Sequence, residues 1–184
     1  DEVVLLALDF IEKIDLKAAL PELKGRLNHP NRKILVRIAN ILLDQEAPDL
    51  KEPFLRLLSN EDAEIRTPGL QYFNRHPDPS IFDLILRLLD EGVKADDHEQ
   101  QLRYIALGRA APDRGLPLLE RILAQNSWFN RARNDHEKAR VIYARGRIGA
   151  EHPDAVTILE KYQNLLKSED LKRACRGALI SLKG

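Results

Sequence analysis

The sequence is poor in features that mark a particular chemistry, and each shortage excludes a class of protein. Its single cysteine, Cys175, cannot form an internal disulfide, which fits a reducing compartment such as the cytoplasm. No apolar run approaches the ~18 residues of a membrane-spanning helix, and the amino-terminal residues lack the pattern of a signal peptide. Lys plus Arg and Asp plus Glu each number 29, so a net charge of zero provides no overall attraction to nucleic acid or anionic membranes. We therefore expect a cytoplasmic protein with no membrane partner.

Signatures of catalysis are also absent from the sequence. It has no Gly-rich phosphate loop, no Gly-x-Ser-x-Gly motif around a nucleophilic serine and no Cys-x-x-Cys pair. Among the histidines, His29, His76 and His152 directly precede proline and are most simply residues of turns. We expect no catalytic residues, no bound metal and no cofactor, so the chain is not expected to be an enzyme.

What the sequence does have is a repeated helical pattern. An apolar residue followed by a basic one recurs at intervals of roughly 30–40 residues, a period typical of repeat proteins. Each pair follows a more apolar helix, and several of those helices are expected to carry a proline in the first turn, where a missing N–H loses no hydrogen bond. The prolines are Pro21, Pro53 and Pro117, and the pairs are Val36-Arg37, Ile65-Arg66, Leu102-Arg103, Ala139-Arg140 and Leu171-Lys172.

This pattern predicts an all-α chain, because no segment alternates as an exposed strand would. An opening helix is expected at residues 3–14, with an apolar face (Val4, Leu8 and Ile11) that packs on the first of five helical hairpins. Since no hairpin can bury its apolar stripe alone, each is expected to pack on its neighbours. Cys175 falls in the last helix, where we expect it to be buried. The hairpins are expected at residues 16–28 with 31–44, 49–59 with 61–75, 79–91 with 98–110, 113–125 with 135–148, and 154–167 with 169–182.

The repeated pairs resemble those of the HEAT repeat family. The resemblance rests on Val36-Arg37, Ile65-Arg66, Leu102-Arg103 and Leu171-Lys172, and on Gly146-Arg147-Ile148-Gly149, which ends a repeat. It covers essentially the whole chain and implies a right-handed α-solenoid in one domain over residues 1–184. The second helix of each hairpin would line the concave face, and its arginine would often brace the neighbouring repeat. The segments 103–108 and 140–146 are shorter than the family pattern, and we expect the chain to be part of a longer protein.

Two acidic motifs leave a metal-dependent alternative open. Asp97-His98-Glu99 and Asp135-His136-Glu137 are each expected to open the second helix of successive hairpins. They are similar to the His-Glu dipeptides of HEAT-repeat deoxyhypusine hydroxylases, and that resemblance implies a di-iron site held from stacked helices. Only two such dipeptides are present, and each precedes its basic residue by several positions. We therefore favour capping, in which acidic residues lie at the positive end of a helix.

The segment 126–134 is expected to be an insertion between the two helices of the fourth hairpin. It holds the only tryptophan, Trp128, beside Phe129, Arg131 and Arg133. Tryptophan and arginine are enriched at interface hot spots, so one interpretation is an exposed binding loop. In the other interpretation, the two aromatic side chains fold back and cover the end of the hairpin, because exposed large aromatic residues are unusual in a monomer.

Two further features bear on nucleic acid and on acidic partners. Ser127-Trp128, with Asp135 nearby, is similar to HEAT-repeat alkylpurine DNA glycosylases in these residues only. Residues 1–99 carry 13 Lys or Arg against 20 Asp or Glu, whereas residues 100–184 carry 16 against 9. This segregation favours an acidic partner and head-to-tail self-association, unless the charges only line solvated helix faces. The densest basic stretch comprises Arg131, Arg133, Lys138, Arg140, Arg145 and Arg147.

Together these features favour a non-catalytic scaffold for protein–protein interaction. We expect a protein partner, with acidic partners favoured, and we do not expect nucleic acid. The hydroxylase-like and glycosylase-like interpretations stay open as alternatives. The residues expected to contact the partner are Trp128, Phe129, Arg131, Arg133, Arg140 and Arg103.

Overall fold

The structure is a computed structural model of the chain. It describes residues 2–14, 16–125, 131–149, 152 and 154–183, and the side chains of residues 12–14 and 131–133 lie outside that description. Across these residues the chain forms eleven α-helices, one short 3-10 helix and no strand, which confirms the expectation of an all-α chain. None of the described helices is both long enough and apolar enough to cross a lipid bilayer.

The helices follow one another in pairs, as the sequence pattern predicts. The 3-10 helix η1 (Pro79–Ile81) leads into α6. The expected boundaries agree with the observed ones to within a few residues, except that α9 begins at Arg131 rather than at residue 135. The order is α1 (Glu2–Ile14), then α2 (Leu16–Gly25) with α3 (Arg32–Asp44), α4 (Lys51–Leu58) with α5 (Ala63–Arg75), α6 (Phe82–Asp90) with α7 (Asp97–Ala110), α8 (Pro112–Ala124) with α9 (Arg131–Ile148), and α10 (Ala155–Leu165) with α11 (Glu169–Lys183).

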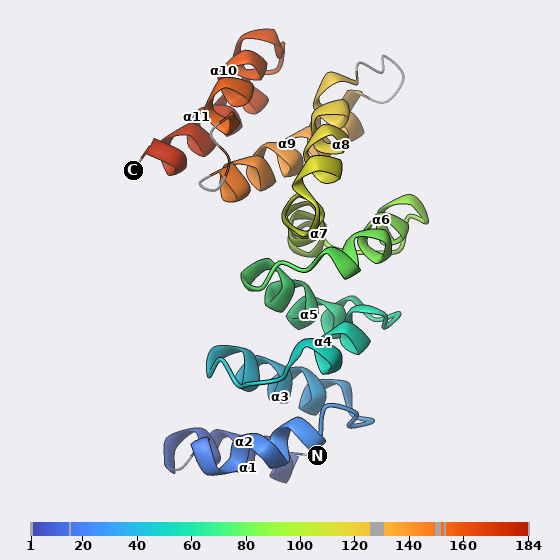
Figure 1. Cartoon of the computed structure of the whole chain (residues 1–184), viewed down its shortest axis with the longest axis vertical. Coiled ribbons are helices and arrows are strands. Elements are labelled where there is room, and N and C mark those ends of the chain that lie inside the picture. Colours follow the sequence, from blue (N-terminus) through green and yellow to red (C-terminus); the bar gives the residue numbers. More distant parts are fainter. Residues whose placement is uncertain (1, 15, 126–130, 150–151, 153, 184) are drawn as a thin grey trace. The chain divides into compact units, whose positions relative to one another are not determined.

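The chain divides into two compact units, Asp1–Arg75 and His76–Gly184. The amino-terminal unit holds α1 to α5, and the carboxy-terminal unit holds η1 and α6 to α11 (Figure 1). Each unit has its own core of buried leucine, isoleucine and phenylalanine side chains, which is what an independently packed body requires. The expectation of one repeat domain over residues 1–184 stays a prediction.

In the amino-terminal unit α3 is the central helix. It packs against α1, α2 and α5, while α4 packs against α5. Its apolar residues recur three and four positions apart, so that Ile34, Ile38 and Ile41 share one face and are at most 2 % exposed. Phe54 of α4 and Phe73 of α5 are buried as well. The helices α1, α3 and α5 therefore form a row in which each packs on the next.

The opening helix α1 packs on the first hairpin, as expected, but through one face only. It contacts α2 and α3, and its Leu8 is buried at 4 % exposure. Val4 was expected to pack in the same way, yet it keeps 40 % of its surface exposed, because it lies at the edge of the packed face. The opposite face carries three apolar side chains that point outward, Val3 (79 % exposed), Leu6 (57 %) and Phe10 (54 %).

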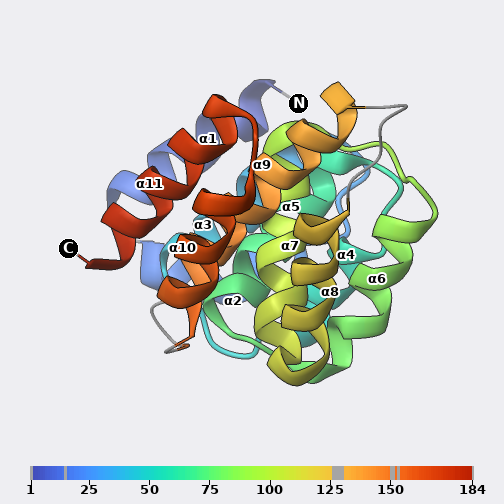
Figure 2. The ribbon, with the colours of Figure 1, turned by 90° about the horizontal axis from the view of Figure 1, so that it is seen from above.

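In the carboxy-terminal unit the second helices form a similar row. α9 packs against both α7 and α11, and each of these three helices also packs against the first helix of its own pair. Seen from above, α7, α9 and α11 lie side by side (Figure 2). The core side chains Ile105, Leu119, Val141 and Leu159 come from successive hairpins and are all buried. The apolar core thus continues from hairpin to hairpin within the unit.

Two small residues mark how closely α9 and α11 approach each other. A Cβ atom added to Gly146 of α9 would lie 2.9 Å from the Cβ atom of Ala178 in α11, so only glycine fits between the helices. On the packed face of α11, Cys175 is fully buried, as expected. Burial raises the pKa of its thiol to about 11, which leaves the sulfur in its unreactive protonated form near neutral pH.

The prolines do not all lie where the sequence pattern places them. Pro53 lies in the first turn of α4, as expected. Pro21 and Pro117 lie farther inside α2 and α8, where each removes a backbone hydrogen bond that another residue would donate. The first-turn expectation is wrong for these two, because both helices begin more than one turn before the proline, and Pro112 holds the first position of α8.

Candidate partner-binding surface

Most of the expected contact residues have side chains outside the described part of the chain. Trp128 and Phe129 fall in residues 126–130, and Arg131 and Arg133 belong to the first turn of α9 with side chains that are not described. The expected insertion at 126–134 is shorter than predicted, because α9 already begins at residue 131. The two remaining residues lie in α7 and α9 of the carboxy-terminal unit.

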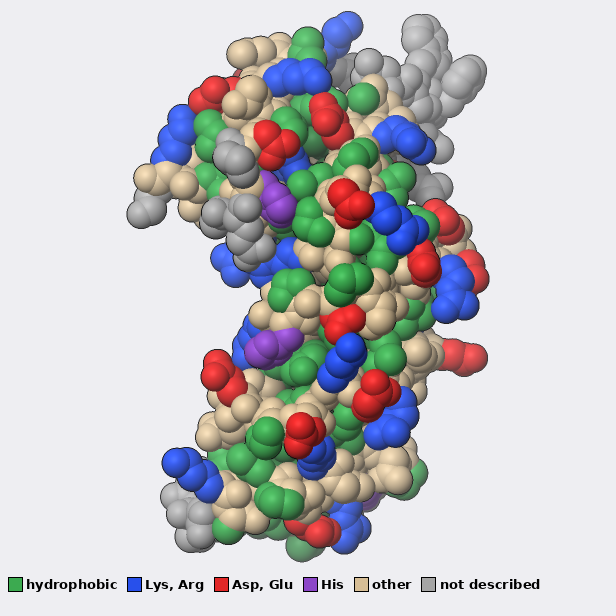
Figure 3. Space-filling model, viewed as in Figure 1, with side chains coloured by type: hydrophobic (Ala, Val, Ile, Leu, Met, Phe, Trp, Pro, Cys, Tyr) green, Lys and Arg blue, Asp and Glu red, His purple; other side chains and the backbone are tan. Residues whose placement is uncertain are grey.

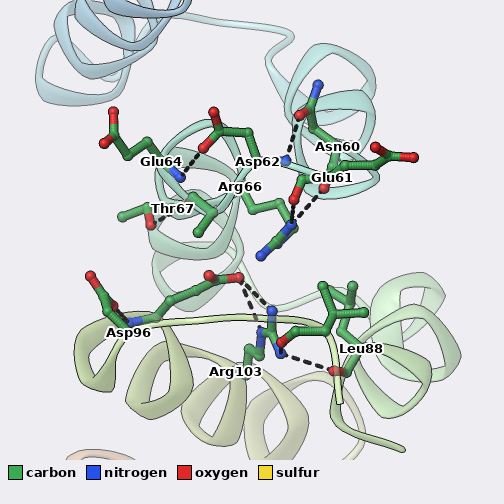
Figure 4. A network of polar contacts seen from close by, with 12 residues as sticks. Asn60, Glu61, Asp62, Glu64, Arg66, Thr67, Leu88, Asp96 and Arg103 are labelled. Carbon is green, nitrogen blue, oxygen red and sulfur yellow. Dashed lines mark hydrogen bonds and ion pairs between the residues drawn. The ribbon is translucent and has the colours of Figure 1, made fainter. Parts of the chain in front are cut away.

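Arg103 of α7 is not a surface residue. Its side chain is 0 % exposed, and its Nη2 atom lies 2.8 Å from Oε1 of Glu99, one turn earlier in the same helix. Its Nη1 atom donates hydrogen bonds to the carbonyl oxygens of Leu88 (2.9 Å) and Val93 (3.1 Å) (Figure 4). These carbonyls lie at the end of α6 and in the turn after it, so Arg103 ties α7 to the first helix of its own pair. A fully buried side chain offers no surface, which corrects the expectation that Arg103 contacts a partner.

Arg66 of α5 makes a comparable brace in the amino-terminal unit. Its side chain is also 0 % exposed, and its Nη1 atom donates to the carbonyl oxygens of Asn60 (2.8 Å) and Glu61 (2.7 Å), between α4 and α5 (Figure 4). Carbonyls at a helix end lack intrahelical donors, and a guanidinium with five N–H donors can satisfy several of them at once. The family resemblance implies arginines that brace a neighbouring repeat, whereas Arg66 and Arg103 each hold a turn of their own hairpin.

Arg140 connects α9 to the start of α7. It forms an ion pair with Asp97, and Nε2 of His136 lies 3.0 Å from Oδ1 of the same carboxylate. The hydrogen bond from Arg140, followed by the one from His136, holds the pKa of Asp97 below its ordinary value. The Arg140 side chain is 21 % exposed, so part of it is accessible although its charge is balanced by Asp97.

A second polar pair connects the same two helices. Tyr104 of α7 is buried, and its hydroxyl donates a hydrogen bond of 2.8 Å to Oε1 of Glu137 in α9. Burial, followed by this hydrogen bond to a carboxylate, raises the pKa of Tyr104 far above its ordinary value, so the hydroxyl stays a donor. Together with the contacts of Asp97, this bond holds α7 and α9 in one rotational setting.

The two Asp-His-Glu motifs therefore meet in space, through Asp97 of the first and His136 of the second. In the part of the chain that the structure describes, no group of three or more His, Cys, Asp or Glu side chains is placed to hold an ion. The Glu99 carboxylate is buried against Arg103, and the Glu137 carboxylate accepts the Tyr104 hydroxyl. This donor set does not fit the di-iron site that the hydroxylase resemblance implies.

The capping interpretation of these motifs holds for one of them only. Asp96, just ahead of the first motif, caps α7 by accepting a hydrogen bond of 2.7 Å from the backbone N–H of Glu99. The second motif lies inside α9, which begins four residues before Asp135. The expectation that Asp135-His136-Glu137 opens a helix is wrong, and the side chains of His136 and Glu137 contact α7 instead.

The densest basic stretch of the sequence does not form a basic surface in its described part. Lys138 (5 % exposed) and Arg145 (1 %) are buried, and burial lowers the pKa of both below their ordinary values. Arg140 is paired with Asp97, which leaves Arg147 as the exposed basic side chain among the described members. On the visible face of the carboxy-terminal unit, acidic and basic side chains are interspersed (Figure 3).

A groove between α9 and α11 is the best candidate surface of the carboxy-terminal unit. It encloses about 290 Å³ and has a floor of glycine, alanine and serine. Two larger side chains stand at its edge, Tyr143, which is 47 % exposed, and Arg147, one turn farther along α9. An aromatic ring and a guanidinium beside a shallow apolar floor are the features of a protein-binding hot spot. The lining residues are Tyr143, Gly146 and Arg147 of α9 and Ala174, Gly177, Ala178 and Ser181 of α11.

Sequence reasoning did not single out this groove. In the sequence, Arg147 stands out only as a member of the basic stretch, and Tyr143 belongs to none of the motifs. A signal was present, because Tyr143 and Arg147 are four residues apart and share one helix face, while Ile142 and Ile148 are buried. Which face of α9 is open becomes evident only once α7 and α11 are seen to pack on the other faces.

Comparisons of the chain with protein-family models, with curated proteins and with solved structures found no match. The case for a binding surface therefore depends on side-chain geometry alone.

Removing the buried guanidinium should destabilise the carboxy-terminal unit strongly. We expect Arg103→Ala to lower the free energy of unfolding by about 3–5 kcal/mol, because it removes a fully buried cation that lies 2.8 Å from the buried Glu99 carboxylate. Urea unfolding followed by circular dichroism measures this change. The control is Arg173→Ala, since Arg173 is 77 % exposed, and its loss should change stability by less than about 0.5 kcal/mol. Equal effects of the two substitutions would contradict the bracing role.

The contacts of Asp97 should make the α7–α9 packing sensitive to acid. The pKa of Asp97 is lower in the folded chain than its ordinary value of 3.8, so its stabilising contribution is present above that pH and is lost as the pH falls through the lowered pKa. Near neutral pH the wild-type chain should be more stable than Asp97→Asn, and this difference should vanish in strong acid. Urea midpoints across a pH series test this, with Asp170→Asn, whose side chain is 90 % exposed, as the control that should change little.

Two glycines that line the same groove should respond oppositely to alanine. Gly177 has no atom within 4 Å of an added Cβ, so Gly177→Ala should raise the stability by up to about 1 kcal/mol, as glycine is a poor helix former. Gly146→Ala should lower it by about 1–3 kcal/mol, because the new methyl group meets Ala178. Thermal and urea unfolding of the two variants measure both changes. A Gly146→Ala chain as stable as wild type would show that α9 and α11 are not closely packed.

Proposed function

We propose that the chain is a HEAT-like α-solenoid segment that binds another protein and catalyses no reaction. Five hairpins and one unpaired opening helix would form a right-handed solenoid whose second helices line the binding face. The proposal draws support from α3 with α5 and from α7, α9 and α11, because within each unit the second helix of one pair packs on that of the next, and the unpaired α1 packs on α3. Buried arginines at Arg66 and Arg103 that hold the hairpin turns fit such a rigid framework.

The observation that carries the binding function is the groove between α9 and α11. Its floor is made of small residues, so a partner can bring a helix or an extended segment close to the backbone. Tyr143 would supply a large apolar contact, and Arg147 would pair with a carboxylate of the partner. We therefore propose that the partner contributes a short segment that is apolar on one side and acidic beside it.

The two alternatives from the sequence receive less support. A hydroxylase-like metal centre would need carboxylates that are available for coordination, whereas those of Glu99 and Glu137 are engaged by Arg103 and Tyr104. A nucleic-acid surface would need clustered exposed cations, but Lys138 and Arg145 are buried. Protein binding requires neither free carboxylates nor a cluster of exposed cations.

Selection of peptides on the purified chain tests the proposal. A displayed library of random helical peptides is enriched on the immobilised wild-type chain, and the selected sequences are synthesised and titrated by fluorescence anisotropy. We expect enrichment of acidic and apolar residues and about tenfold or greater weakening by Tyr143→Ala combined with Arg147→Ala, which corresponds to a loss of at least ~1.4 kcal/mol.

Two further variants separate loss of the groove from general damage. Gly177→Leu adds a side chain where the groove is open and should block binding while the chain remains folded. Arg121→Ala removes an exposed arginine from α8 and should leave binding unchanged. The proposal fails if no peptide is enriched, or if the selected peptides bind the groove variants as well as the wild-type chain.

A further inference from the structure

The two ends of the described chain each carry an amphipathic helix face that points outward. On α1 this face consists of Val3, Leu6 and Phe10, which recur three and four residues apart, and each is more than half exposed. Glu2 and Asp9 flank the same side of the helix and are exposed. We call these five residues the α1 stripe.

The outward face of α11 has the opposite charge. Arg176, Leu179, Ile180 and Lys183 line a shallow hollow of about 520 Å³, and Ile180 is 73 % exposed. We call these four residues the α11 stripe. It is separate from the groove between α9 and α11, because it shares none of the groove's lining residues.

The two stripes match in spacing as well as in charge. Glu2 and Asp9 are seven residues apart on α1, and Arg176 and Lys183 are seven residues apart on α11. Since a helix rises 1.5 Å per residue, both pairs are separated by about 10.5 Å along their helix axes. Val3 and Leu6 lie between the two charges of the α1 stripe and Phe10 directly follows Asp9, whereas Leu179 and Ile180 lie between the two charges of the α11 stripe. Helices laid side by side could therefore form two ion pairs and bury an apolar strip between them.

We propose that the α11 stripe of one copy packs on the α1 stripe of a second copy, in a head-to-tail contact. The contact would continue the packing already present inside each unit, where α1 packs on α3 and α11 packs on α9 through their other faces. The head-to-tail contact would bury Phe10 and Ile180, two large apolar side chains that are otherwise exposed to water.

The charged residues of the stripes can join this contact without losing their present partners. Oδ1 of Asp9 lies 2.8 Å from Nη2 of Arg37, and Nζ of Lys183 lies 3.1 Å from Oε1 of Glu160. Both pairs are exposed, at 52 % for Asp9 and 58 % for Lys183, so they contribute little on their own and can accept a further partner. High salt should weaken the new pairs, because exposed charges are screened.

This arrangement has consequences for the size of the assembly and for its affinity. The contact joins two different surfaces, so one copy can bind two others. The assembly therefore grows with protein concentration, unless the copies close into a ring. A single helix pair buries less than the ~1,600 Å² of a standard interface, so the association is weak. It is also independent of the groove, since the two surfaces differ.

Sedimentation velocity of the whole chain tests the contact. We expect the wild-type chain to shift to faster-sedimenting species between about 10 µM and about 500 µM, a range suited to weak interfaces, and to shift less in high salt. Leu6→Glu with Phe10→Glu removes the α1 stripe, and Ile180→Glu removes the α11 stripe. Each variant alone should remain monomeric, while the control Leu165→Glu, at a residue that is 64 % exposed elsewhere, should associate like the wild-type chain.

Mixing the two stripe variants decides between head-to-tail and symmetric association. Each variant keeps one intact stripe, so an equal mixture should give a heterodimer and nothing larger, which also shows that both variants are folded. Association of Ile180→Glu alone would indicate an α1–α1 contact and overturn the proposal, as would a monomeric wild-type chain throughout the range. Tyr143→Ala with Arg147→Ala should leave sedimentation unchanged, so failure of the groove proposal and failure of this contact are distinguishable.

Discussion

Packing between second helices is the constraint on which the rest of each unit depends. A hairpin of two short helices leaves an apolar stripe that it cannot bury by itself, and here the stripe is covered by the second helix of the next pair. Gly146 shows how tight that packing is, because one methyl group would already push α9 away from α11. A polar group that is buried between two neighbouring second helices must find its partner there, which explains why the hydroxyl of Tyr104 donates a hydrogen bond to Glu137 between α7 and α9.

The buried arginines solve a problem that short hairpins create. Each turn leaves carbonyl oxygens without intrahelical donors, and in a compact unit water does not reach all of them. Arg66 and Arg103 satisfy two such oxygens each. A buried cation is costly by itself, and Glu99 offsets that cost for Arg103. The main effect of the Arg103–Glu99 pair is therefore to fix the position of α7 against the preceding turn. Its net contribution to the free energy of unfolding is smaller than its contacts suggest.

Much of the helical organisation could be predicted from the sequence, because apolar periodicity and turn residues act locally. The pairing of helices and the burial of Cys175 and Leu8 follow from that pattern. The surface could not be predicted equally well. A basic residue on a helix looks the same in sequence whether it faces water, as Arg147 does, or the neighbouring helix, as Arg145 does. The positions of Pro21 and Pro117 within their helices could not be predicted either. Each helix begins more than one turn before its proline, and the proline itself does not determine where the helix starts.

The burial of the single thiol of the chain, on the packed face of α11, determines how it reacts. Alkylating reagents react with the thiolate, and the Cys175 sulfur is both shielded from solvent and held protonated by a pKa of about 11. Modification therefore requires α11 to move away from the helices on which it packs, α9 and α10. The rate at which a maleimide labels the native chain therefore reports how often α11 opens. Because Cys175 is the chain's own single cysteine, the measurement requires no introduced cysteine.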